Sequence, residues 1–448
     1  MKLLLKSITG ICMLMVFAHN VCAQPNDNFS RYDKTILADK AIQLLQENYV
    51  FPNRVPVIEK YISEKLRTGG YDSLNKPEEF IESLNKDLEE KGNDHHLNIS
   101  YGPDRVRQII AANKNEKEGG EEKITTEWLQ KIRYENFRLR KLEWLDGNIG
   151  YFNFLNFTPL APSRQTIVAA MNFLLNSSAI IIDLRENGGG YAETMNFMLS
   201  YFLNDSVQIS TLKYRKDNQV TKSYTLKDKV INKIPGNIPV YILVSSRTSS
   251  AAEGFAYTLQ QYKRAIIIGE QTKGEGNPGR LFVINDNLYI MIPTAEAVNP
   301  VSGKSIDGIG VIPNIQTNKS KALTRALLEA YTLLAANTGI PELKLLYQWQ
   351  IPLLENELKP EQLTETIIAS LVGDYEGGRK IIYENASLFY LNNAGEKEKL
   401  AYMGKGVFQN TLKTWLRLVM PFSDKPIPGF EWTWDDGGKP QKVKKMLK

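Results

Sequence analysis

The first part of the chain carries its apolar residues at helical spacing. The stripes run through Leu37, Ala41 and Leu44, through Ile58, Ile62 and Leu66, and through Phe80, Leu84 and Leu88. Pro77 and the two acidic residues after it mark the start of the third helix, which ends near Gly92. A short apolar–polar alternation over residues 97–101 then predicts a strand. Residues 24–102 are therefore predicted to form an N-terminal helical domain.

From Gly147 onward, continuous apolar runs alternate with amphipathic segments. The sequence predicts strands at residues 149–157, 179–184 and 239–244, and helices at 163–175, 192–203, 251–259 and 319–336. Runs that are apolar at every position are typical of strands covered on both faces of a sheet. Alternating strands and helices indicate an α/β layer, so residues 146–340 are predicted to be the core domain.

Two stretches fall outside this core pattern. Residues 103–145 are densely charged and are predicted to be a solvated linker. Residues 341–448 are predicted to hold a helix followed by short strands between turns rich in Gly, Asn and Asp. That spacing is typical of a small antiparallel β domain. The predicted fold is an α/β core between an N-terminal helical domain and a C-terminal β-rich domain.

The N-terminus has the features of a secretory signal peptide. Two lysines precede an apolar run over residues 8–18, and small residues lead to a cleavage point after Ala23. Residues 1–23 therefore predict export to the periplasm or the cell exterior. A lipid anchor on Cys22 is the alternative, although the residues before it are a poor context for lipidation.

Composition narrows the chemistry that the chain can use. Hydrophobic residues make up 42% and charged residues 23%, as in soluble globular proteins. Both cysteines, Cys12 and Cys22, lie in the leader, so the mature chain has no disulfide, thiol nucleophile or thiolate metal site. Loss of Lys2 and Lys6 lowers the net charge from +5 to about +3, too little to indicate nucleic acid or a membrane surface. Nothing calls for a metal or an organic cofactor.

A cluster of hydroxyl residues lies between a predicted buried strand and a predicted helix. Residues 245–250 read Ser-Ser-Arg-Thr-Ser-Ser and follow the apolar run 239–244. Such a strand-to-helix turn exposes a side chain above the sheet and points unpaired helix N–H groups at a bound molecule. It suits a nucleophile. The alternative is that Thr248 or Ser249 only caps the helix.

Two further segments carry candidate site residues. Gly188, Gly189 and Gly190 follow strand 179–184, where glycines let the backbone approach a ligand and present its N–H groups. Neither nucleotide-binding glycine pattern is present, so an oxyanion hole is the better interpretation. His95 and His96, the two histidines left after leader removal, open the strand at 97–101. Adjacent histidines are also common on protein surfaces.

These segments together resemble the S41 serine peptidases, the family of tail-specific and carboxyl-terminal processing proteases. The matching elements, in chain order, are Asp183-Leu184-Arg185-Glu186-Asn187-Gly188-Gly189-Gly190, Thr248-Ser249-Ser250-Ala251-Ala252-Glu253, Gly269-Glu270-Gln271-Thr272 and Gly308-Ile309-Gly310-Val311-Ile312-Pro313. The resemblance covers roughly residues 30–335 and implies a ClpP/crotonase-like fold. It places the nucleophile at Ser250.

The chain departs from the processing-protease branch of that family. That branch uses a lysine base in a Gly-Lys-Gly context and carries a PDZ domain, whereas Glu275 occupies the lysine position here and no insert of PDZ length exists. Asp94-His95-His96-Leu97 instead resembles the histidine element of the tricorn-core and interphotoreceptor retinoid-binding protein branch. This match favours His96 over His95 and implies that Asp307 stands where that branch has a glutamate.

The predicted roles follow from the chemistry of serine hydrolysis. A serine hydroxyl needs a base, and a Ser-His mechanism has only His95 or His96 to use. The resemblance selects Ser250 as the nucleophile and His96 as the base, so these two residues are the predicted pair. Asp307 is predicted to orient the base, and the N–H groups of Gly189 or Gly190 and of Ala251 to hold the oxyanion. Supporting roles are predicted for Glu253 and Asp183, and Lys273 is the fallback base.

The predicted function is that of an exported serine endopeptidase that cleaves peptides or proteins through an acyl-enzyme. One alternative is a non-catalytic relative that holds a peptide or an apolar molecule in the cleft. A second alternative keeps hydrolysis but replaces the peptide with an ester. No nucleic-acid partner and no stable membrane insertion are expected, and the sequence does not fix the oligomeric state or the substrate.

Overall fold

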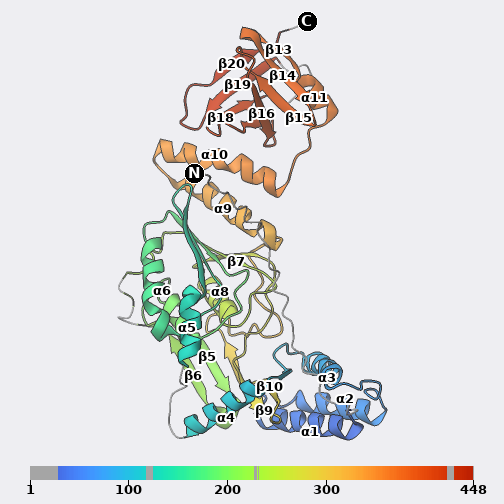
Figure 1. Ribbon diagram of the computed structural model, residues 1–448. Helices are drawn as coiled ribbons and strands as arrows, with labels where there is room; N and C mark the ends of the chain where they lie inside the picture. The colour runs from blue at the N-terminus through green and yellow to red at the C-terminus, as the bar shows by residue number, and fades with distance from the viewer. Residues whose placement is uncertain (1–28, 118–124, 227–229, 231, 421–427, 447–448) are drawn as a thin grey trace, which may run out of the picture.

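The computed structural model describes residues 29–117, 125–226, 230, 232–420 and 428–446. The predicted signal peptide, residues 1–23, lies outside these residues. Among the helices that the structure describes, none combines the length and apolar character needed to cross a bilayer. Figure 1 shows the N-terminal helices and the C-terminal β domain at opposite ends of the molecule, with the α/β core between them.

A six-stranded sheet forms the centre of the core. Its order is β12-β8-β7-β4-β3-β2, parallel except for the antiparallel edge strand β2. The strands are β2 (Leu139–Leu145), β3 (Ile149–Phe154), β4 (Ala179–Asp183), β7 (Val240–Val244), β8 (Ile266–Gly269) and β12 (Ile315–Gln316). Every residue of β4 and β7 is buried, because helices cover both faces of the sheet.

Helices on the two faces complete the core. Helices α6 (Leu160–Leu174), α7 (Ala192–Leu199) and α8 (Ala251–Gln261) bury Met171, Phe197 and Phe255 in one cluster with the sheet. Helices α9 (Ala322–Asn337) and α10 (Pro341–Leu358) form a hairpin, and α9 packs on the other face. This architecture confirms the predicted α/β core and its two flanking domains.

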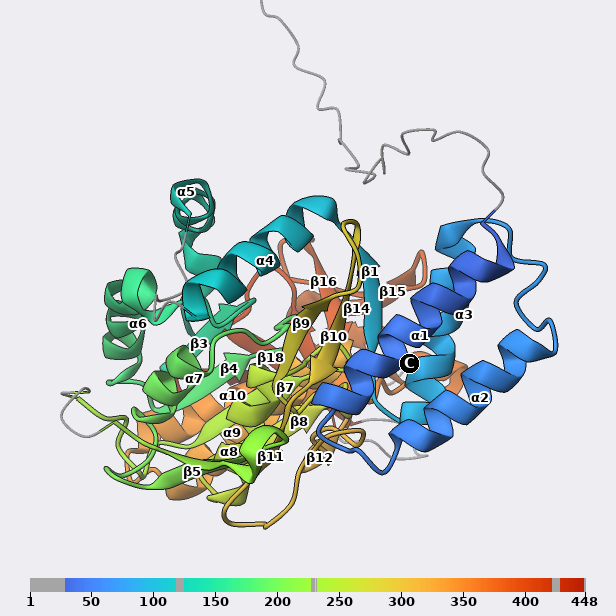
Figure 2. The same ribbon diagram turned by 90° about the horizontal axis from the view of Figure 1, so that it is seen from below.

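The N-terminal domain is joined to the core through a shared sheet. Its helices are α1 (Arg31–Asn48), α2 (Val55–Arg67) and α3 (Pro77–Gly92), followed by β1 (Asn98–Tyr101). Strand β1 pairs with β10 (Leu288–Pro293), which pairs with β9 (Gly279–Val283). Apolar residues of β10 lie in the same buried cluster as the three helices. The loop before β1 is thereby held against the core (Figure 2).

The structure corrects the predicted linker at 103–145. This stretch contains α4 (Pro103–Lys117), α5 (Thr126–Tyr134), the 3₁₀ turn η1 (Asn136–Arg138) and the core strand β2. Helix α4 buries Val106 and Ile109, while most of its other side chains are exposed and polar. Dense charge therefore reflects the solvated faces of helices here, and charge density alone does not separate such helices from a linker.

A second small sheet flanks the core. It has the order β11-β5-β6, with β5 (Gln208–Tyr214), β6 (Val220–Tyr224) and β11 (Ala295–Val298). The 3₁₀ turn η2 (Lys216–Asn218) joins β5 to β6 in an antiparallel hairpin. A further 3₁₀ turn, η3 (Lys319–Lys321), leads into α9.

The C-terminal domain is an eight-stranded antiparallel meander. After α11 (Glu365–Leu371) come β13 (Gly373–Tyr375), η4 (Glu376–Gly378), β14 (Arg379–Glu384), β15 (Ser387–Leu391), β16 (Lys397–Tyr402), β17 (Val407–Asn410), β18 (Leu416–Val419), β19 (Gly429–Trp434) and β20 (Gln441–Lys444). A bridge between Tyr375 and Lys445 connects the first and last strands. Large side chains, among them Phe408, Phe430 and Trp432, fill its interior. The domain therefore has a packed core.

Candidate active site

Three loops that carry predicted site residues leave the same edge of the central sheet. They follow β4, β7 and β8, which are neighbouring parallel strands. The carboxyl ends of parallel strands lie at one edge, where α/β proteins bind ligands. Residues 183–190, 245–250 and 270–276 are therefore brought together by the sheet itself.

Ser250 is the residue at the turn between β7 and α8. Its backbone has φ 55° and ψ −125°, a conformation that is costly for a residue with a side chain. Ser250 is exposed, whereas Thr248 and Ser249 are buried. Neither Thr248 nor Ser249 is the N-cap of α8, because Ser250 holds that position. The turn thus presents the Ser250 hydroxyl above the edge of the sheet.

The glycine loop lies against this turn. A β-carbon placed on Gly189 would come 2.6 Å from the Ser250 β-carbon and 3.0 Å from the Ala251 nitrogen. The Gly189 N–H donates to the Asn187 side-chain oxygen at 2.9 Å. Within the described part of the chain, the N–H groups of Gly190 and Ala251 have no hydrogen-bond partner. Of the two predicted glycines, Gly190 is the one with an available donor.

Asn187 organises the loop, a role that the sequence alone does not reveal. Its side chain is fully buried, donates to the Phe154 carbonyl at 3.0 Å and accepts from Gly189. Its carbonyl accepts the Ser249 N–H at 3.2 Å. Asn187 therefore fixes the glycine loop to both β3 and the serine turn.

Glu253 connects the serine turn to the loop after β8. One carboxylate oxygen accepts from the Thr272 hydroxyl at 2.6 Å and the Gly274 N–H at 2.7 Å. The other accepts from the N–H groups of Glu275 at 2.8 Å and Ser250 at 2.9 Å. Burial raises the Glu253 pKa, and these four hydrogen bonds oppose that effect. The carboxylate thus holds the Ser250 backbone in its strained conformation.

We expect Glu253→Gln to destabilise the fold and to reduce Ser250 reactivity. The amide would point an N–H₂ group at two donors, leaving buried N–H or O–H groups without acceptors. Each such group costs about 1–3 kcal/mol, so the free energy of unfolding should fall by about 2 kcal/mol or more. Urea denaturation measures this change. An unchanged denaturation midpoint would show that the Glu253 carboxylate does not stabilise the serine turn. Glu127→Gln, which alters an exposed carboxylate in the first turn of α5, is the control.

His96 reaches the site from the N-terminal domain. It lies in the loop between α3 and β1, and its side chain is 11% exposed. Its Nδ1 atom lies 3.1 Å from an Asp94 oxygen and 3.6 Å from an Asp307 oxygen. Asp307 comes from the loop between β11 and β12, on the far side of the site. The shared sheet β1-β10-β9 therefore brings the histidine and Asp307 together.

Asp94, part of the histidine element but without a predicted role, is the nearer carboxylate. It is 1% exposed, accepts the Tyr49 hydroxyl at 2.8 Å and accepts the His96 N–H at 3.0 Å. Arg54 donates to the Gly92 and Asn93 carbonyls and holds the end of this loop. These contacts fix the position of Asp94 before any substrate binds.

The charges around His96 change its basicity. Burial lowers the His96 pKa, but the hydrogen bond and charge of Asp94 and the charges of Asp307 and Glu275 outweigh it, so the pKa is raised. Burial and the nearby Asp94 charge raise the pKa of Asp307 to about 6. Both carboxylates favour the protonated imidazolium that a serine hydrolase forms during reaction.

The remaining predicted residues lie around this centre. The Lys273 ammonium, the predicted fallback base, is half exposed and is held in a salt bridge with Glu275. Asp183 accepts the Tyr151 hydroxyl at 2.6 Å and two Arg185 nitrogens at 2.9 and 2.5 Å. It therefore anchors the start of the glycine loop. His95 pairs with Glu89 on the surface, away from Asp94 and Asp307.

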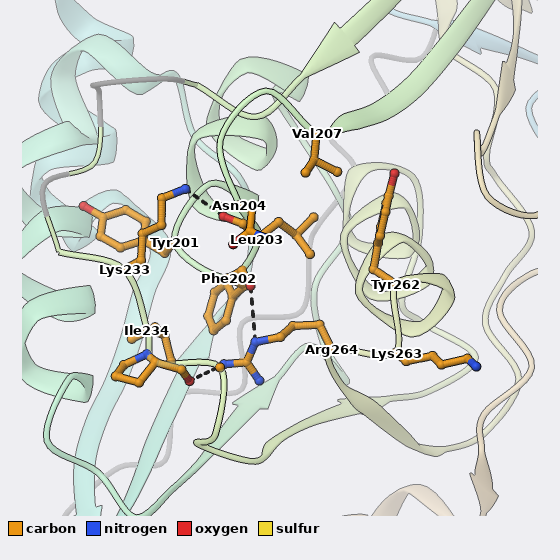
Figure 3. Close-up of a pocket in the computed structure, with 12 residues that line it drawn as sticks. Tyr201, Phe202, Leu203, Asn204, Val207, Lys233, Ile234, Tyr262, Lys263 and Arg264 are labelled. Atoms are coloured by element: carbon orange, nitrogen blue, oxygen red, sulfur yellow. Dashed lines mark hydrogen bonds between the residues drawn. The ribbon is translucent and has the colours of Figure 1, made fainter.

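A pocket of about 440 Å³ lies elsewhere. Its lining includes residues 262–264, which follow the end of α8 opposite Ser250. Figure 3 shows the side chains around it. Its lining also includes Tyr201 and Phe202. The Arg264 guanidinium donates to the carbonyls of Phe202, Ile238 and Pro235. Each nitrogen of this guanidinium donates to a backbone carbonyl, so the side chain stabilises the fold.

Two family descriptions match the chain. Residues 148–317 match peptidase family S41, and residues 31–132 match the N-terminal domain of peptidase S41 in eukaryotic IRBP. The first match contains the serine turn and the glycine loop, and the second contains His96 and Asp94.

Individual proteins show the same similarity. The carboxy-terminal-processing protease of Bartonella bacilliformis is 30% identical over 38% of this chain and 39% of its own length. The chloroplastic carboxyl-terminal-processing peptidase 1 of Arabidopsis thaliana is 27% identical over 40% and 36%, respectively. These alignments span well under half of either relative. A solved photosystem II D1 C-terminal processing protease aligns with a TM-score of 0.39 at 16% identity, covering 64% of this chain and 94% of that one.

Proposed function

The chain belongs to peptidase family S41, and we propose that it is an exported serine endopeptidase that acts by a Ser-His mechanism. The observation that carries this proposal is the turn at Ser250. Its strained backbone presents an exposed hydroxyl near the N–H groups of Gly190 and Ala251, which have no hydrogen-bond partner among the residues that the structure describes. Peptides or proteins are the proposed substrates, in keeping with the names of its relatives.

The proposed reaction begins with attack by the Ser250 hydroxyl on a peptide carbonyl. Because Asp94 and Asp307 occupy the Nδ1 side of His96, Nε2 is the atom that accepts the serine proton. The oxyanion forms next to the N–H groups of Gly190 and Ala251, and His96 returns its proton to the leaving amine. Water then hydrolyses the acyl-enzyme by the same route.

Asp94 and Asp307 are proposed to share the orienting role that the sequence assigns to Asp307 alone. Asp94 lies closer to Nδ1 and is held by Tyr49, so it fixes the ring orientation. Asp307 is held by the Asn277 N–H at 3.2 Å and adds a second negative charge. Glu253 and Asp183 act through the backbone of the serine turn and the glycine loop.

The domain assignment completes the proposal. Residues 146–340 supply the nucleophile and the oxyanion hole, and the N-terminal domain supplies the base. The signal peptide at residues 1–23 would direct the protein to the periplasm or the cell exterior. The C-terminal β domain, which has a filled interior, is assigned no part in the chemistry.

A fluorophosphonate probe tests the proposal directly. Such probes modify serines that an adjacent base has activated. Incubation of the purified protein, proteolysis and mass spectrometry should place a single modification on Ser250. A folded protein that stays unlabelled would contradict the proposed peptidase activity. It would favour the alternative of a non-catalytic protein that holds a peptide or an apolar molecule in the cleft. Hydrolysis of an ester but of no peptide would correct the substrate class.

The pH dependence of labelling tests the environment of His96. The base must be neutral to accept a proton, so the labelling rate should rise with pH, with a midpoint above 6.5 because the His96 pKa is raised. Asp307→Asn removes a charge that stabilises the imidazolium, so its midpoint should be lower. Rates measured between about pH 5 and pH 9 decide this. An unchanged midpoint in Asp307→Asn would show that Asp307 does not act on His96.

A further inference from the structure

Three side chains that can bind a metal ion meet at the Nδ1 atom of His96. They are His96 itself, Asp94 and Asp307, and one nitrogen or oxygen atom from each lies within 4.8 Å of the others. Nδ1 is 3.1 Å from the Asp94 oxygen and 3.6 Å from the Asp307 oxygen. The two carboxylates that orient His96 in the proposed mechanism thus also place the ligand atoms of a cation site at this point.

The two distances from Nδ1 are close to the separations of ligand atoms around a tetrahedral zinc ion. Zinc binds histidine nitrogen and carboxylate oxygen at about 2.0–2.2 Å, which places neighbouring ligand atoms about 3.3–3.6 Å apart. The two distances from Nδ1 lie at or near this range. One imidazole and two carboxylates suit Zn²⁺ or Co²⁺, and three protein ligands leave a fourth position for water.

The ligands are also held in place as metal ligands are. The side chains of Asp94 and Asp307 are 0% and 5% exposed. Tyr49 donates to the Asp94 oxygen that does not face Nδ1, and the Asn277 N–H donates to Asp307. Outer contacts of this kind orient ligands and support affinity.

We propose that His96 Nδ1, Asp94 and Asp307 form an inhibitory site for a divalent transition-metal ion such as Zn²⁺. The inhibitory part rests on the proposed Ser-His mechanism. In the metal-free neutral ring, the proton is on Nδ1 and Nε2 accepts the serine proton. Metal binding takes the Nδ1 lone pair, so the single ring proton moves to Nε2. The ring then has no free lone pair for the Ser250 proton, and the nucleophile is not activated.

Metal binding is tested first without reference to activity. Protein without a polyhistidine tag is stripped with a chelator and titrated with Co²⁺, whose visible absorption reports a low-coordinate site. We expect saturation at one ion per chain, with competition by Zn²⁺. His96→Ala and Asp307→Asn should each weaken binding at least about 10-fold. His95→Ala is the matched control, because the neighbouring His95–Glu89 pair is exposed and lies outside the site.

Inhibition is then measured by fluorophosphonate labelling of the same protein. Saturating Zn²⁺ should slow labelling of Ser250 at least about 10-fold, and a chelator should restore it. In Asp307→Asn, a higher Zn²⁺ concentration should be needed for the same inhibition.

Each outcome has a distinct meaning. Absence of Co²⁺ binding by a protein that labels normally would overturn the metal site and leave the peptidase intact. Metal binding by a protein that never labels would keep the site and overturn the peptidase. Loss of binding in His95→Ala but not in His96→Ala would move the ion to the surface pair and overturn the proposal. Binding without any effect on labelling would overturn the inhibitory role.

Discussion

Ser250→Ala should lower peptide hydrolysis on the order of 10⁶-fold while leaving the protein folded. Ser250 carries the exposed hydroxyl next to the Gly190 and Ala251 N–H groups, for which the described part of the chain offers no hydrogen-bond acceptor. Without this hydroxyl no acyl-enzyme can form, and only the oxyanion donors and the binding surface remain to accelerate hydrolysis. Cleavage of a fluorogenic peptide or a protein substrate by matched enzyme concentrations measures the loss, and circular dichroism verifies the fold.

Ser249→Ala is the control for that substitution. Ser249 is the preceding residue of the same turn, is 7% exposed and keeps its backbone contact to Asn187 when its hydroxyl is removed. We expect Ser249→Ala to retain activity within about tenfold. A larger loss of activity in Ser249→Ala than in Ser250→Ala would show that Ser250 is not the nucleophile.

His96→Ala should produce a loss of similar size, because nucleophile and base act as one unit. The buried His96 ring has two carboxylates against Nδ1, which leaves Nε2 for the serine proton. Without this base, the hydroxyl remains a weak nucleophile. Peptide cleavage should fall on the order of 10⁶-fold, and fluorophosphonate labelling should fall with it. The double variant with Ser250→Ala should lose little beyond either single change.

Two substitutions separate His96 from the other candidate bases. His95→Ala should be nearly neutral, because His95 pairs with Glu89 at the surface. Lys273→Ala should also leave cleavage largely intact, because the ammonium is held by Glu275. Survival of activity in His96→Ala together with its loss in Lys273→Ala would transfer the base to the lysine.

The sequence predicted secondary structure correctly where the residues of a single segment are enough to define its conformation. The continuous apolar runs of β4 and β7 fix two buried parallel strands, and the turns that follow them must leave one edge of the sheet. The third helix begins at Pro77 and ends at Gly92, so its boundaries are readable from its caps. The linker prediction at 103–145 was wrong, because α4 and α5 are helices with many exposed charged residues and few buried apolar ones.

The sequence by itself determined the α/β core and the two flanking domains, because these follow from periodicity, and it gave Ser250 and His96 as the candidate pair through motifs that resemble those of the S41 family. Only the tertiary structure decided which groups surround the pair. Tyr49 meets Asp94 across 45 residues, and Asp307 reaches His96 because β1 pairs with β10. Likewise, the Asn187 side chain occupies the Gly189 N–H and leaves Gly190 free. Such contacts depend on packing between distant segments, and no spacing along the chain records them.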